Sequence, residues 1–145
     1  MKLVVDANIV ISGMITAHGV VGELLLRTYP PLELFAPENL RIEVSKYREK
    51  IARAARIGVD DVAYLEEQVL APVHIVPDPL IPPAIWERAF DLVRAIDEDD
   101  AQFIAIALHL NCPLWTGDKK LLSGLRRKGF DLLVTSEELR KKLGQ

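Results

Sequence analysis

Acidic side chains stand at three places along the chain where they could act together. Asp6 ends the apolar segment 2–5, and Asp118 follows the apolar segment 114–116 after one glycine. A run of four acids, residues 97–100, comes directly before the most apolar helical segment. Carboxylates that lie together repel each other, which raises their pKa values unless a cation compensates the charge. Clustered carboxylates without histidine or thiolate favour a hard divalent ion, Mg²⁺ or Mn²⁺. Each acid taken alone could also serve as a helix cap or a solvated charge.

Short apolar runs alternate with helical patterns along the chain, and these elements must position the acids. The runs predict strands at residues 2–5, 32–36, 73–76, 114–116 and 132–134. Helical spacing, prolines and capping residues predict helices at residues 9–15, 20–29, 37–57, 60–70, 84–95, 101–110 and 119–128, and a last helix after the capping box at 135–138. This alternation predicts a mostly parallel sheet of four or five strands between helices, a three-layer α/β/α sandwich. Ligands of such sheets bind beyond the carboxyl ends of the strands.

The composition suits one globular domain. Half of the 145 residues are apolar and 27% are charged, which is too apolar for a disordered chain. No apolar run reaches the roughly 18 residues that a membrane span needs, and the first residues lack the pattern of a secretory signal. We therefore expect a single domain over residues 1–145, located in the cytoplasm and not bound to a membrane. The single cysteine, Cys112, allows no internal disulfide.

The net charge of −3 hides blocks of opposite sign. Residues 41–56 carry a net charge of +4, residues 60–100 carry −9, and residues 119–145 carry +5. Blocks of this kind can place a basic rim around an acidic centre. They can equally be the solvated faces of helices.

Three motifs together resemble the PIN-domain nucleases. They are VVDANIVIS at residues 4–12, DDAQFIAIAL at 99–108 and WTGDKKL at 115–121, and they cover nearly the whole chain in the family's order. The resemblance implies a compact α/β/α sandwich whose acids bind one or two Mg²⁺ or Mn²⁺ ions. It also implies hydrolysis of phosphodiester bonds in RNA.

The resemblance carries four acids over to this sequence as catalytic residues. The first acid is Asp6, the acid before Ala-Gln-Phe-Ile-Ala is Asp100, and the acid of the Thr-Gly-Asp motif is Asp118. Glu43 best matches the family's second acid, in the helix after the second strand. Asp97 is an alternative metal ligand beside Asp100, because residues three apart on a helical turn can face the same ion. The expected metal ligands are therefore Asp6, Asp97, Asp100 and Asp118, with the main ligand of the acidic run being either Asp97 or Asp100.

Polar neighbours of these acids are implied in the same way. Glu38 and Glu49 are close enough to Glu43 to compete for its assignment. Asn8 and Thr116 resemble the polar residues that accompany the acids in the family, where they would hydrogen-bond carboxylates or water. Helix capping and bonds at strand ends explain both residues as well.

The implied mechanism depends on divalent ions and on basic side chains. The ions would activate a water molecule and neutralise charge on the leaving 3′-oxygen. The basic blocks would attract the phosphates of RNA. The residues expected to hold the RNA backbone are Lys46, Arg48, Lys50, Lys119 and Lys120.

The leading hypothesis is thus a metal-dependent endoribonuclease, as in the toxin of a VapBC-type toxin–antitoxin pair. Such toxins often form homodimers and are inhibited by a small antitoxin protein. Free-standing PIN proteins with RNA-processing roles fit the sequence equally well. One alternative is a PIN-like scaffold that binds RNA or protein without cutting. Another is a receiver-type domain that accepts a phosphoryl group, but such a domain has two adjacent acids at its first strand. Here Asp6 is followed by Ala7 and Asn8.

Overall fold

Five parallel strands form one sheet in the computed structural model, which describes residues 1–16, 19–26 and 31–144. The strands are β1 (Lys2–Val5), β2 (Glu33–Pro37), β3 (His74–Val76), β4 (Leu114–Trp115) and β5 (Leu133–Val134). Their order in the sheet is β3-β2-β1-β4-β5. β1 is central and pairs in register with β2 through Leu3 and Leu34, and with β4 through Val5 and Trp115. The predicted strands and the parallel sheet are confirmed.

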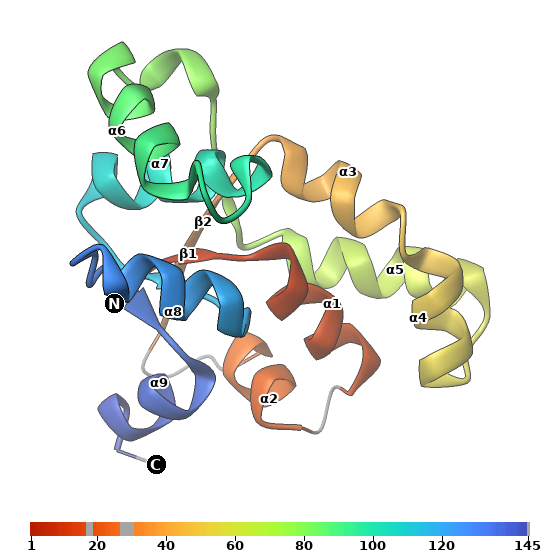
Figure 1. The fold of residues 1–145 in the computed structure, drawn as a ribbon. Coiled ribbons are helices and arrows are strands. Elements are labelled where there is room, and N and C mark those ends of the chain that lie inside the picture. Colours follow the sequence, from red (N-terminus) through yellow and green to blue (C-terminus); the bar gives the residue numbers. More distant parts are fainter. Residues whose placement is uncertain (17–18, 27–30, 145) are drawn as a thin grey trace.

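Helices cover both faces of this sheet (Figure 1). They are α1 (Ala7–Ile15), α2 (Val20–Leu26), α3 (Asn39–Ser45), α4 (Arg48–Ala55), α5 (Val59–Leu70), α6 (Pro83–Val93), α7 (Ala101–Leu110), α8 (Lys119–Arg127) and α9 (Ser136–Lys142), with short 3-10 turns η1 (Asp78–Leu80) and η2 (Glu98–Asp100). In the view of Figure 1, α6 and α7 lie above the sheet and α1 and α2 below it. The three-layer α/β/α sandwich is therefore confirmed.

The core explains why the central strand is continuously apolar. Leu3, Val4 and Val5 have no exposed surface, as expected for a strand that is covered on both faces. α7 packs against β1, β2 and β4 and buries Phe103 and Ile104. This packing fixes the direction of α7, so that its amino end and the preceding turn η2 reach the carboxyl edge of the sheet.

The strand order places a topological switch point beside β1. From β1 the chain moves outward to β2 and β3, then crosses over to β4 and β5 on the other side of β1. Open α/β sheets bind ligands at this kind of point, beyond the strand ends. The order also differs from the 2-1-3-4-5 order of receiver-type domains, so the receiver hypothesis is wrong.

Two predicted boundaries are wrong in the region after β2. Pro37 ends β2 and does not open a helix, and the predicted helix 37–57 is two helices, α3 and α4. The Ser45 hydroxyl donates to the carbonyl of Ile42 at 2.8 Å, and the Tyr47 N–H donates to the carbonyl of Val44 at 3.0 Å. These bonds compete with the continuing helical pattern and tighten the end of α3.

Other boundaries differ by a few residues. The predicted helix 20–29 ends at Leu26, and residues 27–29 lie outside the described residues. Residues 98–100 of the acidic run form a separate 3-10 turn, η2, just before α7. Within the part of the chain that the structure describes, no single helix is long and apolar enough to cross a membrane.

Candidate functional site

A cavity of about 520 Å³ opens at the carboxyl edge of the sheet, between β1, α3, η2 and β4. The lining residues are Asp6, Ala7, Asn8, Ile11, Asn39, Glu43, Lys46, Tyr47, Asp97, Asp99, Asp100, Gln102 and Asp118. Six of them are acids and one, Lys46, is basic. The four acids that the sequence predicts to act together, with Asp97 as the alternative ligand, therefore line one cavity.

Asp6 is the most buried of these acids, with 6% of its surface exposed. Its N–H donates to the Trp115 carbonyl at 3.1 Å, which extends the pairing of β1 with β4 and fixes the backbone. Although Asp6 stands at the start of α1, its side chain makes no capping hydrogen bond. Burial raises the pKa of the carboxyl, against the opposing effect of a hydrogen bond from Thr116. Its side-chain partner is thus Thr116 at the neighbouring strand end, and the backbone N–H groups of Ala7 and Asn8 also lower its pKa.

Thr116 links the two strand ends that carry Asp6 and Asp118. Its buried hydroxyl donates to Asp6 Oδ2 at 2.7 Å and accepts from the Asp118 N–H at 3.1 Å. Asp118 Oδ1 in turn accepts from the Leu121 N–H at 3.1 Å and so caps α8. The hydroxyl thus orients the Asp6 carboxylate while the cap orients that of Asp118.

The turn η2 presents the acidic run to the cavity. Asp97 Oδ1 accepts from the Asp99 N–H at 3.0 Å and so caps the turn. Asp100 is partly buried, and its pKa is raised to about 7, first by desolvation and then by the charges of Asp6, Asp97, Asp118 and Glu43. The pKa of Asp100 is therefore raised by the charges of four other acids of the cavity wall.

Glu43 reaches the cavity from α3. Its pKa is also raised, mainly by burial, against a hydrogen bond from Asn39, and the charges of Asp6 and Asp99 add to the rise. Lys46 lowers the Glu43 pKa by its charge. Glu38 and Glu49 do not line the cavity, which favours Glu43 as the second acid.

These shifts predict that the metal-free protein becomes less stable as pH rises from about 5 to 8. The folded state keeps a proton on Asp100 up to about pH 7, whereas the unfolded chain loses it near 3.8. The folded state therefore binds more protons in this window, so stability falls as pH rises. Calorimetric unfolding in EDTA measures the effect, and Asp100→Asn should flatten it. An unfolding temperature that rises with pH over this range would contradict the prediction.

The donor set fits a hard divalent cation. Every acidic group in the cavity wall offers carboxylate oxygens, the ligands that Mg²⁺ and Mn²⁺ prefer. Burial and then repulsion by four neighbouring acids raise the pKa of Asp100, and a bound cation would relieve this repulsion. Across residues 1–16, 19–26 and 31–144, no three acidic, histidine or cysteine groups converge tightly enough to hold an ion as they stand.

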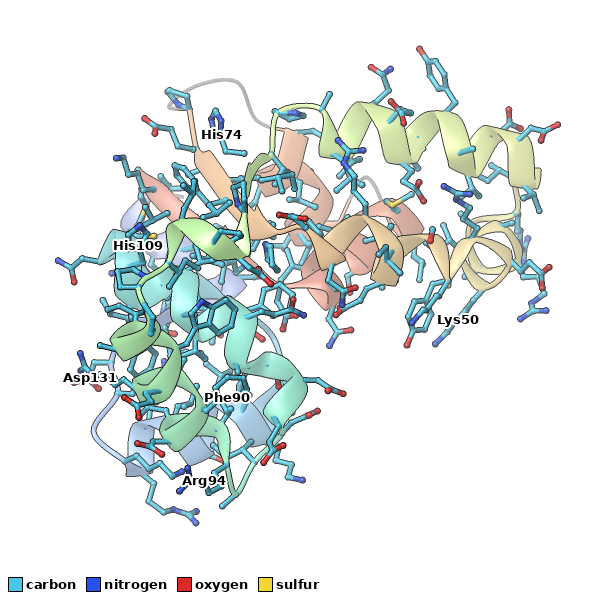
Figure 2. The ribbon with its side chains drawn as sticks, turned by 90° about the horizontal axis from the view of Figure 1, so that it is seen from above. Lys50, His74, Phe90, Arg94, His109 and Asp131 are labelled. Carbon is cyan, nitrogen blue, oxygen red and sulfur yellow. The ribbon has the colours of Figure 1, made fainter. Side chains whose placement is uncertain are left out.

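The predicted polar and basic residues divide into two groups. Asn8 and Lys46 line the cavity, and Thr116 bonds to two of its segments. Lys119 and Lys120 begin α8 directly after Asp118 and are exposed, but they lie outside the wall. Lys50 lies in the α4 part of the molecule, with its ammonium 5.8 Å from the Tyr47 ring centre (Figure 2).

Arg48 is predicted to hold the RNA backbone, but in the structure it pairs with an acidic side chain of the protein. Its guanidinium donates to both oxygens of the buried Glu66 carboxylate, at 3.0 and 2.5 Å. This bidentate pair ties the start of α4 to α5. Arg48 is thus a structural residue of the helix pair beside the cavity.

Arg48→Ala is expected to lower the midpoint of urea unfolding, because it leaves a buried carboxylate without a partner. The double variant Arg48→Met/Glu66→Leu should recover most of the loss, since it removes both charges. Urea unfolding followed by circular dichroism measures both effects. Equal midpoints for wild type and Arg48→Ala would show that the pair contributes nothing.

Sequence reasoning missed two polar residues of the wall, Asn39 and Gln102, and it considered Tyr47 only for stacking on RNA bases. Asn39 lies four residues before Glu43 on α3, and Gln102 lies two residues after Asp100. The first spacing puts both side chains on one helix face, which is the signal that could have identified Asn39. Tyr47 reaches the cavity wall because α3 ends at Ser45, just before it.

Comparisons with known proteins agree with this architecture. A family model described as "PIN domain" matches residues 4–142. The fold is also similar to that in the crystal structure of PAE2754 from Pyrobaculum aerophilum, with a TM-score of 0.68 and 19% sequence identity. That match covers 99% of this chain and 90% of the other. No curated protein matches the chain significantly. Because the family model spans almost the whole chain, the protein belongs to the PIN-domain family, whose members are generally nucleases.

Proposed function

We propose that this protein is a metal-dependent endoribonuclease. The observation that carries the proposal is that Asp6, Glu43, Asp100 and Asp118, which come from four separate segments, line one cavity at the switch point of the sheet. The family match supports a nuclease-type role. The repulsion among the acids supports a cation, and the basic side chain in the wall supports a phosphate-bearing substrate.

The position of each residue in the site indicates which part of the reaction it would support. When bound, Mg²⁺ or Mn²⁺ supplies positive charge that lowers the pKa of a water molecule and neutralises the leaving oxygen. Asp6, Glu43, Asp100 and Asp118 would hold the cation, with Asp97 beside them. Thr116 orients Asp6, because its hydroxyl donates to the carboxylate, and this bond opposes the rise of the Asp6 pKa that burial causes. Burial of Asp6 limits the access of bulk water to this side of the cavity.

Lys46 is the residue best placed to hold an RNA phosphate, because it lies in the cavity wall and is exposed. Lys119 and Lys120 follow Asp118 and extend the basic surface on the α8 side. Lys50 extends it along α4. A substrate strand would therefore cross the acidic cavity with basic side chains at both ends.

Lys46→Gln is expected to weaken RNA binding and to lower the salt dependence of binding. Loss of one phosphate contact to a single strand reduces the slope of log K against log salt by about 0.7. Fluorescence anisotropy in EDTA, where the RNA stays intact, gives the slope. Lys142→Gln on the distant α9 is the matched control and should leave the slope unchanged. A wild-type slope in Lys46→Gln would remove Lys46 from the interface.

The experiment that tests the proposed function is cleavage of a panel of single-stranded and hairpin RNAs with Mg²⁺, Mn²⁺ or EDTA, with DNA of the same sequence as a comparison. We expect cleavage of RNA with either metal and none in EDTA. Cleavage that persists in EDTA would contradict the metal mechanism. Metal-supported binding of RNA without any cleavage would favour the scaffold hypothesis.

A toxin role with a small antitoxin partner is a finer proposal within this function. The cavity wall has six acids against one lysine, so a basic peptide segment would be the complementary inhibitor. An inhibitor of this kind would compete with the cation for the same carboxylates.

A further inference from the structure

Two neutral amides hold one oxygen of the Glu43 carboxylate. Asn39 Nδ2 donates to Glu43 Oε1 at 2.9 Å, and Gln102 Nε2 reaches the same oxygen at 3.3 Å. Asn39 comes from the first turn of α3, one turn before Glu43, and Gln102 from the first turn of α7. The carboxylate is thus held from its own helix and from a segment 59 residues away in sequence.

The other oxygen carries no such bond. Within the described residues, none of the side-chain hydrogen bonds of the structure reaches Glu43 Oε2. Two donors on one oxygen fix the plane of a carboxylate and leave the second oxygen available to another ligand. The bonding is therefore asymmetric and is compatible with monodentate binding of a metal ion through Oε2.

Gln102 also joins two of the segments that bear acids. Its Nε2 lies 3.4 Å from the Asp99 carbonyl, and an amide group has two hydrogens to donate. One side chain therefore ties α3, through Glu43, to the turn that carries Asp99 and Asp100. The tie joins the segment of Glu43 to the turn that ends at Asp100.

Both amides are neutral, and this matters for the attraction of a cation to Glu43. A lysine or arginine at either position would pair with Glu43 and cancel the charge that attracts a cation. An amide orients the carboxylate and leaves its full negative charge. Asn39 and Gln102 can thus position a metal ligand without competing with the metal for the negative charge of Glu43.

We propose that Asn39 and Gln102 are positioning residues that hold the Glu43 carboxylate, with Oε2 free, for a divalent cation. The proposal rests on the proposed function, because it assumes that Glu43 contacts the ion. Residues that orient metal ligands typically contribute 10–100-fold to metal affinity. A merely structural tie between α3 and α7 would instead contribute to the stability of the metal-free protein.

The test is Mn²⁺ binding by isothermal titration calorimetry at pH 8, together with thermal unfolding in EDTA. Asn39→Leu and Gln102→Met keep the side-chain size but remove the donors. We expect each to weaken Mn²⁺ binding about 10-fold, with metal-free unfolding temperatures close to the wild-type value. Gln68→Met, an exposed position on α5, is the matched control and should bind Mn²⁺ as the wild type does.

A double-mutant cycle with Glu43→Gln shows whether the amides act through Glu43. In that background, Asn39→Leu should cause no further loss of affinity, because the group that it positions is already neutral. An equal loss in both backgrounds would overturn the proposal.

Two further outcomes separate a failure of the positioning role from a failure of the proposed function. Wild-type Mn²⁺ affinity in both amide variants, with binding intact in the wild type, would overturn the positioning role and leave the proposed function standing. A wild-type protein that binds no Mn²⁺ would overturn both.

Discussion

Asp100→Asn is expected to reduce RNA cleavage by at least about 100-fold and at the same time to raise the unfolding temperature of the metal-free protein at pH 8. Replacement of residues that merely support metal ligands costs 10–100-fold, and a direct ligand should cost more. The stabilising effect follows from the Asp100 pKa of about 7, because the charged form is disfavoured in the folded protein at pH 8. Activity and stability should therefore change in opposite directions.

Asp131→Asn is the matched control, since Asp131 is exposed and lies far from the Lys50 side of the molecule (Figure 2). It should change neither cleavage nor unfolding temperature. Asp100→Asn protein that retains full cleavage, or that becomes less stable in EDTA, would show that the carboxylate is not part of a repulsive metal-binding cluster.

Mn²⁺ is expected to raise the unfolding temperature of the wild type by roughly 5–10 °C when its concentration is 100 times the dissociation constant. Binding to the folded state alone at that ratio adds about 2.7 kcal/mol. For a domain of this size, each kcal/mol corresponds to about 2–4 °C. At one fixed Mn²⁺ concentration the rise should be larger at pH 8 than at pH 5, because at pH 5 the cation must displace the proton that Asp100 holds and its affinity is lower.

Differential scanning fluorimetry over a Mn²⁺ titration measures this effect, and excess EDTA should reverse it. Asp6→Asn should abolish most of the rise, because Asp6 is the most buried acid of the cavity wall. An equal rise in wild type and Asp6→Asn would place the ion elsewhere. No rise at millimolar Mn²⁺ would argue against a cation site.

The sequence predicts the acidic edge of the sheet because strand ends are local features. Asp6 and Asp118 follow apolar runs, and parallel strands bring their carboxyl ends to one edge. The pairing of β1 with β4, which makes the two acids neighbours, is not visible in the runs themselves. Glu43 was assigned through the family resemblance alone, and its place in the cavity depends on how α3 leaves β2.

Side-chain partners are the part that sequence patterns could not predict. The basic block at 41–56 suggested a surface for RNA, but the Arg48 side chain turns to the buried Glu66 and only Lys46 faces the cavity. The choice depends on how α4 packs on α5, which is a tertiary contact. The contact between Gln102 and Glu43 likewise joins segments whose distance is set by the packing of α7 on the sheet.

The most direct measurement is a crystal structure of the protein grown with Mn²⁺, in which anomalous scattering locates the ion. We expect a peak in the cavity at roughly 2.0–2.3 Å from carboxylate oxygens of Asp6 and of at least two among Glu43, Asp100 and Asp118. An ion that contacts no more than one of these four side chains would contradict it.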